Sequence, residues 1–182
     1  MSPLARSPLM LEHALLGFVR QRPTHAYEIH QMLQHSEKLG LVWHLKQSQL
    51  YALLTRLEES GYLASTTEPQ GSRPPRKILH LTEEGHAAFE EWVSTPVEHG
   101  RDFRLEFLAK LFFARQQGTT TAAQLIASQR RACEEWLAEL HAKAARSSAE
   151  SYDWLVLQFR VGQINAVVDW LTLCETTLAS DE

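Results

Sequence analysis

Two groups of polar side chains in this sequence have the types and spacing to recognise another molecule. The first is a run of amides, hydroxyls and one cation: Lys46, Gln47, Ser48, Gln49, Tyr51 and Thr55. The second is a cluster of cations with no acid among them: Arg73, Arg76 and Lys77. Amides can pair with the edge of adenine, hydroxyls suit several bases, and Lys and Arg bind phosphate oxygens. These residues indicate contacts to the bases and phosphates of double-stranded DNA.

The first group lies at the start of a predicted amphipathic helix. Apolar residues recur at i, i+3, i+4 and i+7, at Leu50, Leu53, Leu54 and Leu57, so one face is apolar. Gly61 is expected to end the helix. A helix with one buried side and a polar N-terminal end is typical of the second helix of a helix-turn-helix. An ordinary surface helix with a solvated first turn and a half-buried Tyr51 is the alternative.

A β-hairpin with a long tip is predicted directly after this helix. Two strand-like runs, residues 62–67 and 76–81, flank a loop rich in Pro, Gly and Ser at residues 68–75. The cations lie at the tip, and Glu68, the nearest acid along the chain, is at the opposite end of the loop. Thr82 is expected to cap a following helix. Three helices and a basic hairpin are the plan of a winged helix-turn-helix. The alternative is that the cations of the hairpin belong to a solvated loop that contacts no DNA.

The chain resembles the PadR family of bacterial transcriptional regulators over roughly residues 9–93. The matching segments are Leu9 to Val19 as a first helix, residues 24–29 opening a second, residues 49–63 as the third, the arginine-bearing wing, and residues 81–85. The resemblance implies a DNA-binding homodimer, usually a repressor and often released by a small molecule. The longer branch of that family also has a C-terminal helical dimerisation domain, for which this chain has room.

Three positions depart from the family pattern. Ala26 replaces a usual Gly, Gln47 and Ser48 replace a commoner Pro-Gly pair, and Leu79 replaces a frequent Tyr. None of these changes removes a charge from the expected DNA face, but an operator sequence cannot be carried over from relatives. A two-fold dimer would place its recognition helices about 34 Å apart on a pseudo-palindromic operator. An effector that changed this spacing would release the DNA.

The C-terminal half is predicted to be a separate helical domain. Pro96 stops the preceding helix, so we expect a winged helix-turn-helix DNA-binding domain at residues 1–95 and an α-helical dimerisation domain at 96–182. Three helices are predicted there, at about residues 103–117, 121–146 and 152–178. The last has apolar residues in steps of three and four, at Trp154, Leu157, Val161, Ile164, Val168 and Leu171. This seam predicts a dimer interface; an intramolecular three-helix bundle would bury the same residues.

Net charge does not indicate a nucleic-acid binder. The chain of 182 residues has a formal net charge of −4. Residues 1–95 contain nine Lys and Arg against ten acids, and residues 96–182 contain nine against twelve. Local clustering of cations governs phosphate contact, so we expect modest non-specific affinity and reliance on dimerisation. Long apolar runs and a signal-peptide pattern are absent, which favours a soluble cytoplasmic protein with no membrane contact.

Several side chains are weaker candidates for a role. By the resemblance, Trp43, Trp92 and Trp154 could line an effector pocket near the junction of the domains, while core packing is the alternative. Cys133 and Cys174 have no C-x-x-C spacing and are expected to be reduced, buried thiols. Two arginines next in sequence to Cys133 could lower its pKa, which leaves oxidation sensing open.

Catalytic, cofactor and metal-binding patterns are missing from the sequence. The nine His residues are scattered, and the sequence has no H-E-x-x-H, P-loop, G-x-S-x-G or G-x-G-x-x-G motif. An enzyme, a cofactor and a metal site are therefore not expected. A winged helix that contacts only other proteins is the alternative to a DNA-binding regulator, since the overall acidic balance favours it. Steep loss of binding with salt would distinguish DNA binding.

Overall fold

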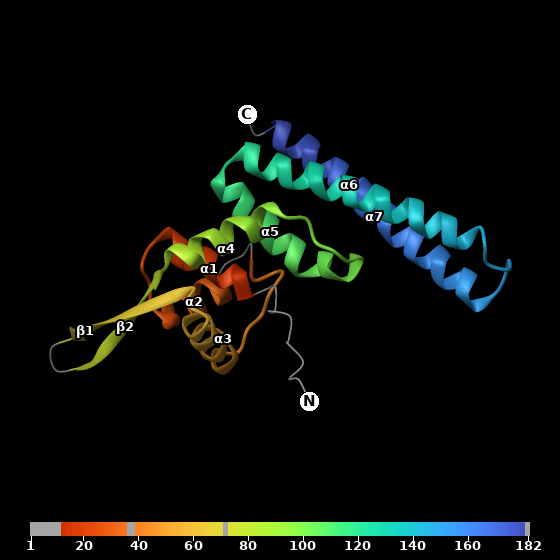
Figure 1. The fold of residues 1–182 in the computed structure, drawn as a ribbon. Helices are drawn as coiled ribbons and strands as arrows, with labels where there is room; N and C mark the ends of the chain where they lie inside the picture. Colours follow the sequence, from red (N-terminus) through yellow and green to blue (C-terminus); the bar gives the residue numbers. More distant parts are fainter. Residues whose placement is uncertain (1–11, 36–38, 71–72, 181–182) are drawn as a thin grey trace. The chain divides into compact units, whose positions relative to one another are not determined.

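The computed structural model describes residues 12–35, 39–70 and 73–180, and it is mainly helical (Figure 1). Its elements in chain order are α1 (His13–Gln21), α2 (Ala26–His35), α3 (Gln47–Glu59), β1 (Leu63–Gln70), β2 (Arg73–Leu81), α4 (Glu83–Ser94), the 3-10 helix η2 (Gly100–Arg104), α5 (Glu106–Gln117), α6 (Thr119–Ala144) and α7 (Tyr152–Ser180). Three helices, a hairpin and then long helices confirm the predicted fold class. The predicted start of the first helix, residues 9–11, lies outside the described residues.

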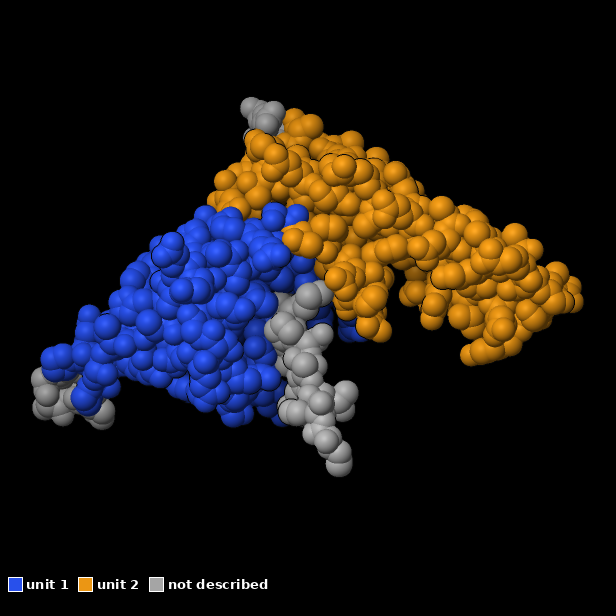
Figure 2. Space-filling model, in the orientation of Figure 1, with its two compact units in different colours: residues 1–94, 104–113 blue, residues 95–103, 114–182 orange. Residues whose placement is uncertain are grey.

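The chain forms two compact units (Figure 2), residues 1–94 with 104–113, and residues 95–103 with 114–182. The boundary predicted at residues 95/96 differs from this division, because residues 104–113 pack with the first unit. Phe113 gives the physical reason, since its ring lies edge-on to Phe18 at 5.4 Å and to Phe89 at 5.6 Å between ring centroids. Gly17 makes room for it: a Cβ there would lie 2.5 Å from the Phe113 ring.

α3 is a helix because its apolar face is buried and its first turn has a polar partner. Leu50, Leu54 and Leu57 are buried, and Leu53 is half-buried. The backbone N–H of Lys46 donates to the side-chain carbonyl of Gln49 at 3.2 Å. This contact satisfies one of the backbone groups that a helix start leaves without a partner.

Gly61 ends α3, as predicted. Its φ of 78° is in the left-handed region, which glycine adopts without steric cost. The N–H of Gly61 then donates to the carbonyl of Glu58, and the N–H of Tyr62 donates to that of Leu57, both at 2.9 Å. These two bonds are a Schellman closure, and they hold the last turn of α3 in a fixed position beside the hairpin.

β1 and β2 form an antiparallel ribbon, the wing (Figure 1), with Leu63 opposite Leu81 at its base and Gln70 opposite Arg73 at its far end. The predicted long loop at residues 68–75 is wrong, because strand pairing continues through most of it. Residues 71–72 lie outside the described residues.

Three prolines explain why this stretch was predicted to be a loop, and they are tolerated for a physical reason. Pro69, Pro74 and Pro75 all lie within the strands. In a two-stranded ribbon each strand is an edge, so a residue without an N–H can face outward. The register also shifts beside Pro69, which lets the ladder pass that residue.

Two contacts attach the wing to the helices. Thr24, before α2, forms an isolated bridge with Leu79 of β2, with N–H to carbonyl distances of 3.2 and 2.9 Å. Thr82 caps α4 as predicted, because the Gly85 N–H donates to its hydroxyl at 2.9 Å. The same hydroxyl donates to the carbonyl of Gly61 at 2.7 Å. The start of α2 and the end of α3 are therefore both fixed against the wing.

The second unit is dominated by α6 and α7, which pack against each other (Figure 1). Their bounds confirm the two long helices predicted from sequence to within a few residues. The buried residues of α7 are Val161, Ile164, Leu171 and Leu178. In the part of the chain that the structure describes, no helix is long and apolar enough to cross a membrane.

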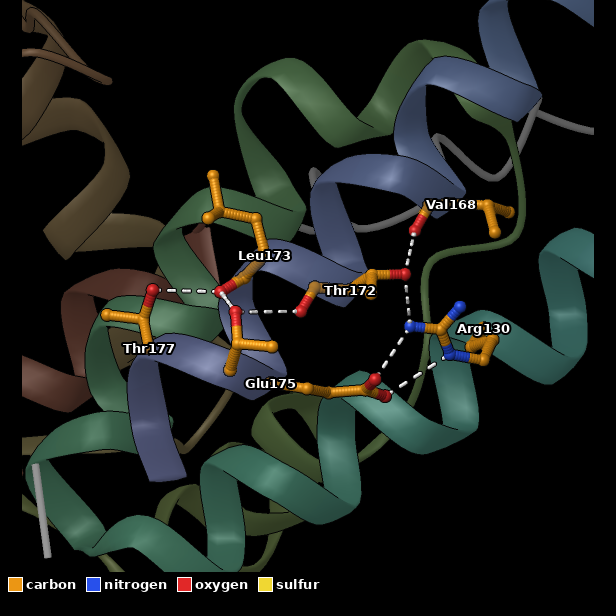
Figure 3. A network of polar contacts seen from close by, with 7 residues as sticks. Arg130, Val168, Thr172, Leu173, Glu175 and Thr177 are labelled. Atoms are coloured by element: carbon orange, nitrogen blue, oxygen red, sulfur yellow. Dashed lines mark hydrogen bonds and ion pairs between the residues drawn. The ribbon is translucent and has the colours of Figure 1, made fainter. Parts of the chain in front are cut away.

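A polar network joins α6 to α7 (Figure 3). The guanidinium of Arg130 donates to the two carboxylate oxygens of Glu175, at 3.2 and 2.8 Å, and to the hydroxyl of Thr172 at 3.0 Å. The preceding residue of α6, the buried Gln129, accepts from the N–H of Val97 at 2.7 Å through its side-chain carbonyl and donates from its amide nitrogen to the carbonyl of Val97 at 3.3 Å. These contacts set the register of the two helices and attach the segment that enters the second unit.

Candidate nucleic-acid interface

A groove of about 490 Å³ lies between α2, α3 and β2 in the first unit. Predicted contact residues from two separate stretches meet in it: Tyr51 and Thr55 from α3, and Arg76 and Lys77 from β2. The fold brings them together because the wing is bonded to the start of α2 while α3 ends at the base of the wing. Hydroxyls and cations that share one groove suit the oxygens of a phosphate backbone.

The remaining predicted residues of α3 are at its start and are exposed: Lys46, Gln47, Ser48 and Gln49. Gln49 has an internal role, since its carbonyl accepts the N–H of Lys46 and its amide nitrogen is left to donate outward. The side chains of Gln47 and Ser48 are exposed, so both can reach a bound molecule. Contact between these residues and base edges stays a prediction.

The cations of the wing are less isolated than the sequence suggested. No acid lies among them in the sequence, but in the structure Lys77 Nζ lies 2.7 Å from a carboxylate oxygen of Glu58. Glu58 is 19 residues away in sequence, and the last turn of α3 brings it beside β2. Glu68 is also the cross-strand partner of Arg76. The side chain of Arg73 lies outside the described residues.

α2 and the residue before it contribute groove residues that were not predicted from sequence: His25, Tyr27 and Gln31. Tyr27 is 56% exposed, and its hydroxyl accepts a hydrogen bond from Gln31 Nε2 at 2.8 Å. His25 Nδ1 lies 3.2 Å from the carbonyl oxygen of Lys77. The i, i+4 spacing of Tyr27 and Gln31 was a signal that they share a helix face, but nothing in the sequence placed that face beside the wing.

Arg56 of α3 contacts the protein rather than lining the groove. It forms an ion pair with Glu12, just before α1. Glu12 is buried, and this burial raises the pKa of its carboxyl, while the charge of Arg56 acts to lower it. Arg56 therefore anchors the last turn of α3 to the residue before α1.

The apolar seam predicted for dimerisation is partly used inside the chain. Val161, Ile164 and Leu171 are buried within the second unit, while Trp154, Leu157 and Val168 are half-buried. The opposite side of α7, which we call the outer face, exposes large apolar side chains: Tyr152, Leu155, Phe159 and Leu173. The sequence pattern identified one apolar face of α7 and missed the other.

Comparison with known proteins adds independent information. The profile described as "Transcriptional regulator PadR-like family" matches residues 15–91, from α1 to α4. Residues 15–91 form a PadR-like family domain. A second profile, described as "Virulence activator alpha C-term", matches residues 103–179 and so covers α5 to α7. The PadR-like match includes the groove and the wing.

Two named relatives resemble this PadR-like chain at the sequence level. It is 27% identical to the negative transcriptional regulator PadR of Bacillus subtilis over 172 residues, which is 89% of this chain and 93% of that protein. It is 26% identical to the probable transcriptional regulator Rv1176c of Mycobacterium tuberculosis over 96 residues, 53% of this chain and 50% of that protein.

Solved structures of Bacillus subtilis PadR are also similar to it. The complex with operator DNA has a TM-score of 0.44 and 26% identity, covering 92% of this chain and 98% of that one. The complex with p-coumaric acid has a TM-score of 0.43 and 25% identity, covering 95% and 99%.

The tryptophans of this PadR-like chain are packed rather than exposed. Trp43 and Trp92 are buried in the first unit, and Trp154 is half-buried in the second. The indole N–H of Trp92 donates to the carboxylate of Glu106 at 3.1 Å, and Lys110 Nζ lies 3.1 Å from the same oxygen and 5.4 Å from the centre of the Trp92 ring. The three tryptophans do not line the groove, so their role in an effector pocket stays a prediction.

The cysteines have the environment of structural thiols. Burial raises the pKa of Cys133 to about 11, and burial also raises the pKa of Cys174. Arg130 acts to lower the pKa of Cys133, but the effect of burial is larger. Among the residues that the structure describes, no group of three His, Cys, Asp or Glu side chains could hold a metal ion.

Proposed function

We propose that this PadR-like chain is a sequence-specific DNA-binding repressor that acts as a cytoplasmic homodimer and is released by a small-molecule effector. The observation that carries the DNA part is the groove, where Tyr51 of the recognition helix meets Arg76 and Lys77 of the wing. These side chains suit phosphates. The exposed Gln47 and Ser48 at the start of α3 supply donors and acceptors for base edges in the major groove.

The relatives support the direction of regulation and the kinds of partner. Bacillus subtilis PadR is a negative transcriptional regulator, which supports repression by this chain. That protein has been solved with operator DNA and with p-coumaric acid. We therefore propose a pseudo-palindromic operator that overlaps a promoter, so that bound protein excludes polymerase, and a small organic effector that weakens DNA binding. Trp43, Trp92 or Trp154 stays a candidate to line the pocket for this effector.

For the homodimer, we propose that a second copy packs on the outer face of α7. Tyr152, Leu155 and Phe159 follow one another in steps of three and four, as in a coiled-coil seam. They are 79%, 55% and 66% exposed, and a helix face of this kind is stabilised by an identical face from a partner. The half-buried Trp154, Leu157 and Val168 belong to the seam on the opposite side of α7 and lie outside this proposed contact.

A binding titration tests the regulator proposal. Fluorescence anisotropy with the DNA upstream of the chain's own gene, repeated at several salt concentrations, should show tight binding that competitor DNA of unrelated sequence does not displace. The affinity should fall steeply with salt, because phosphate contacts release counterions. A winged helix used only for protein contacts is the second candidate, which the ion pair between Lys77 and Glu58 favours. Weak, unselective binding at every salt concentration would support that candidate.

A further inference from the structure

The acids of the groove are already engaged, which leaves its donors for another anion. The carboxylate of Glu28 accepts from the hydroxyl of Thr24 at 2.5 Å and lies 3.8 Å from a guanidinium nitrogen of Arg22. The hydrogen bond from Thr24 is the main cause of a lowered pKa at Glu28. The other acid in the lining, Glu58, is paired with Lys77. The surface of the groove therefore presents little unpaired negative charge.

Glu58 and Lys77 differ in how firmly each is held. The side chain of Glu58 is only 18% exposed, and its backbone carbonyl belongs to the closure that ends α3. The side chain of Lys77 is 58% exposed and ends in an ammonium with three donors on a flexible stem. Lys77 can therefore turn from Glu58 to another anion in the groove without any change in the backbone.

Tyr27 of α2 supplies a second donor in the groove. Its hydroxyl oxygen accepts from Gln31, and this contact leaves the hydroxyl hydrogen to donate elsewhere. A hydroxyl that accepts one hydrogen bond becomes a better donor for the next. Tyr27 also lines the same groove as Lys77, so an anion placed between α2 and β2 would meet an ammonium and a phenol.

We propose that this groove seats one phosphate of the DNA backbone, held by Lys77 and Tyr27, and that the carboxylate of Glu58 takes the place of that phosphate in the free protein. DNA binding then exchanges one anion for another at Lys77. The inference rests on the proposed DNA-binding function. It adds a specific consequence: Glu58 competes with DNA, so removal of its charge increases affinity.

Five variants and one matched control test the exchange and the role of Tyr27. Glu58→Gln removes the competing charge and keeps the shape of the side chain. Glu59→Gln removes the same charge from the next, exposed residue of α3, which does not line the groove. Lys77→Met removes the ammonium, and the two glutamine variants are repeated in that background. The affinity of the full chain for the DNA upstream of its own gene is measured by anisotropy at one fixed salt concentration, and circular dichroism confirms folding.

We expect Glu58→Gln to tighten DNA binding about fivefold more than Glu59→Gln, in the range of a partly buried ion pair. In the Lys77→Met background this difference should disappear, because no ammonium is left to be released. Tyr27→Phe, which removes one oxygen, should weaken binding severalfold.

Each contrary result has a distinct meaning. Equal effects of Glu58→Gln and Glu59→Gln, or weaker binding by Glu58→Gln, would overturn the exchange while leaving the regulator proposal intact. Unchanged affinity of Tyr27→Phe would overturn the assignment of Tyr27. Absence of selective DNA binding by the unaltered chain would overturn the proposed function itself.

Discussion

At the scale of single residues, the polar and exposed character of the start of α3 was predictable, but the partners of its side chains were not. The sequence alone indicated Lys46, Gln47, Ser48 and Gln49 as polar residues on an exposed first turn, and all four are exposed. The sequence could not show that the side-chain carbonyl of Gln49 accepts the backbone N–H of Lys46 at the helix start. Nor could it show that Lys77 has Glu58 as a partner, because that pair is created by the way the chain turns after Gly61.

Lys46 and Gln47 should differ in what they contribute to DNA binding. Lys46→Ala should weaken binding to all sequences alike and reduce the salt dependence by about one phosphate contact. Gln47→Ala should cost about 1–3 kcal/mol on the preferred sequence and little on others, because an amide reads a base edge. Anisotropy with matched and mutated operators measures both. A uniform loss for Gln47→Ala would contradict base contact by this residue.

Cys133 should make stability depend on pH in the alkaline range. Burial raises the pKa of its thiol from 9.0 to about 11, so the folded state binds the proton more tightly than the unfolded state. The stability that the neutral thiol supports is fully present below pH 9 and is lost as the pH rises toward 11. Urea unfolding of the unaltered chain and of Cys133→Ala, measured between pH 9 and 11, tests this prediction. If both proteins lost the same free energy of unfolding with rising pH, groups other than Cys133 would cause the loss.

At the scale of elements, helices were predicted well and the wing was predicted in part. Apolar periodicity identified α3, α6 and α7 because each has one face in a core. The extent of β1 and β2 was missed, since prolines that normally indicate a loop lie on the edges of a ribbon here. The packing of α5 with the first unit was also missed, because it depends on Phe113 fitting beside Gly17. That fit is a property of the folded chain.

The network between α6 and α7 should stabilise the second unit measurably. Arg130→Ala removes a two-pronged contact with Glu175 and the bond to Thr172, and it should lower the free energy of unfolding by about 1 kcal/mol, since the pair is partly exposed to solvent. Arg131→Ala is the matched control, because that neighbouring arginine is exposed. Urea denaturation compares them, and equal loss in both variants would refute the role of the network.

At the scale of the whole molecule, the central question is how two copies bind one operator. A single winged helix contacts too few base pairs for high selectivity, so dimerisation is part of the proposed function. The sequence predicted the apolar seam of α7, and three of its members are buried inside the chain. The outer face of the same helix could not be recognised from periodicity alone, because both faces carry apolar residues and only packing shows which one is covered.

Leu155→Glu should convert the dimer to a monomer. A carboxylate at the centre of the outer face would be buried without a partner in a dimer, and the resulting monomer should lose most of its operator affinity. Gln124→Glu adds the same charge to an exposed position of α6 and serves as the control. Sedimentation velocity gives the mass of each. A Leu155→Glu protein that remains dimeric would place the interface elsewhere.

The most direct measurement compares the operator affinity of the unaltered chain with that of the triple variant Arg73→Ala, Arg76→Ala, Lys77→Ala. A second triple variant, Lys143→Ala, Arg146→Ala, Arg160→Ala, removes the same charge from exposed cations of the second unit. If the wing and α3 bind DNA, the wing variant should lose most of its affinity and much of its salt dependence, and the control should keep both. Selective binding that survives in the wing variant, or falls equally in both, would contradict a DNA interface built on the wing.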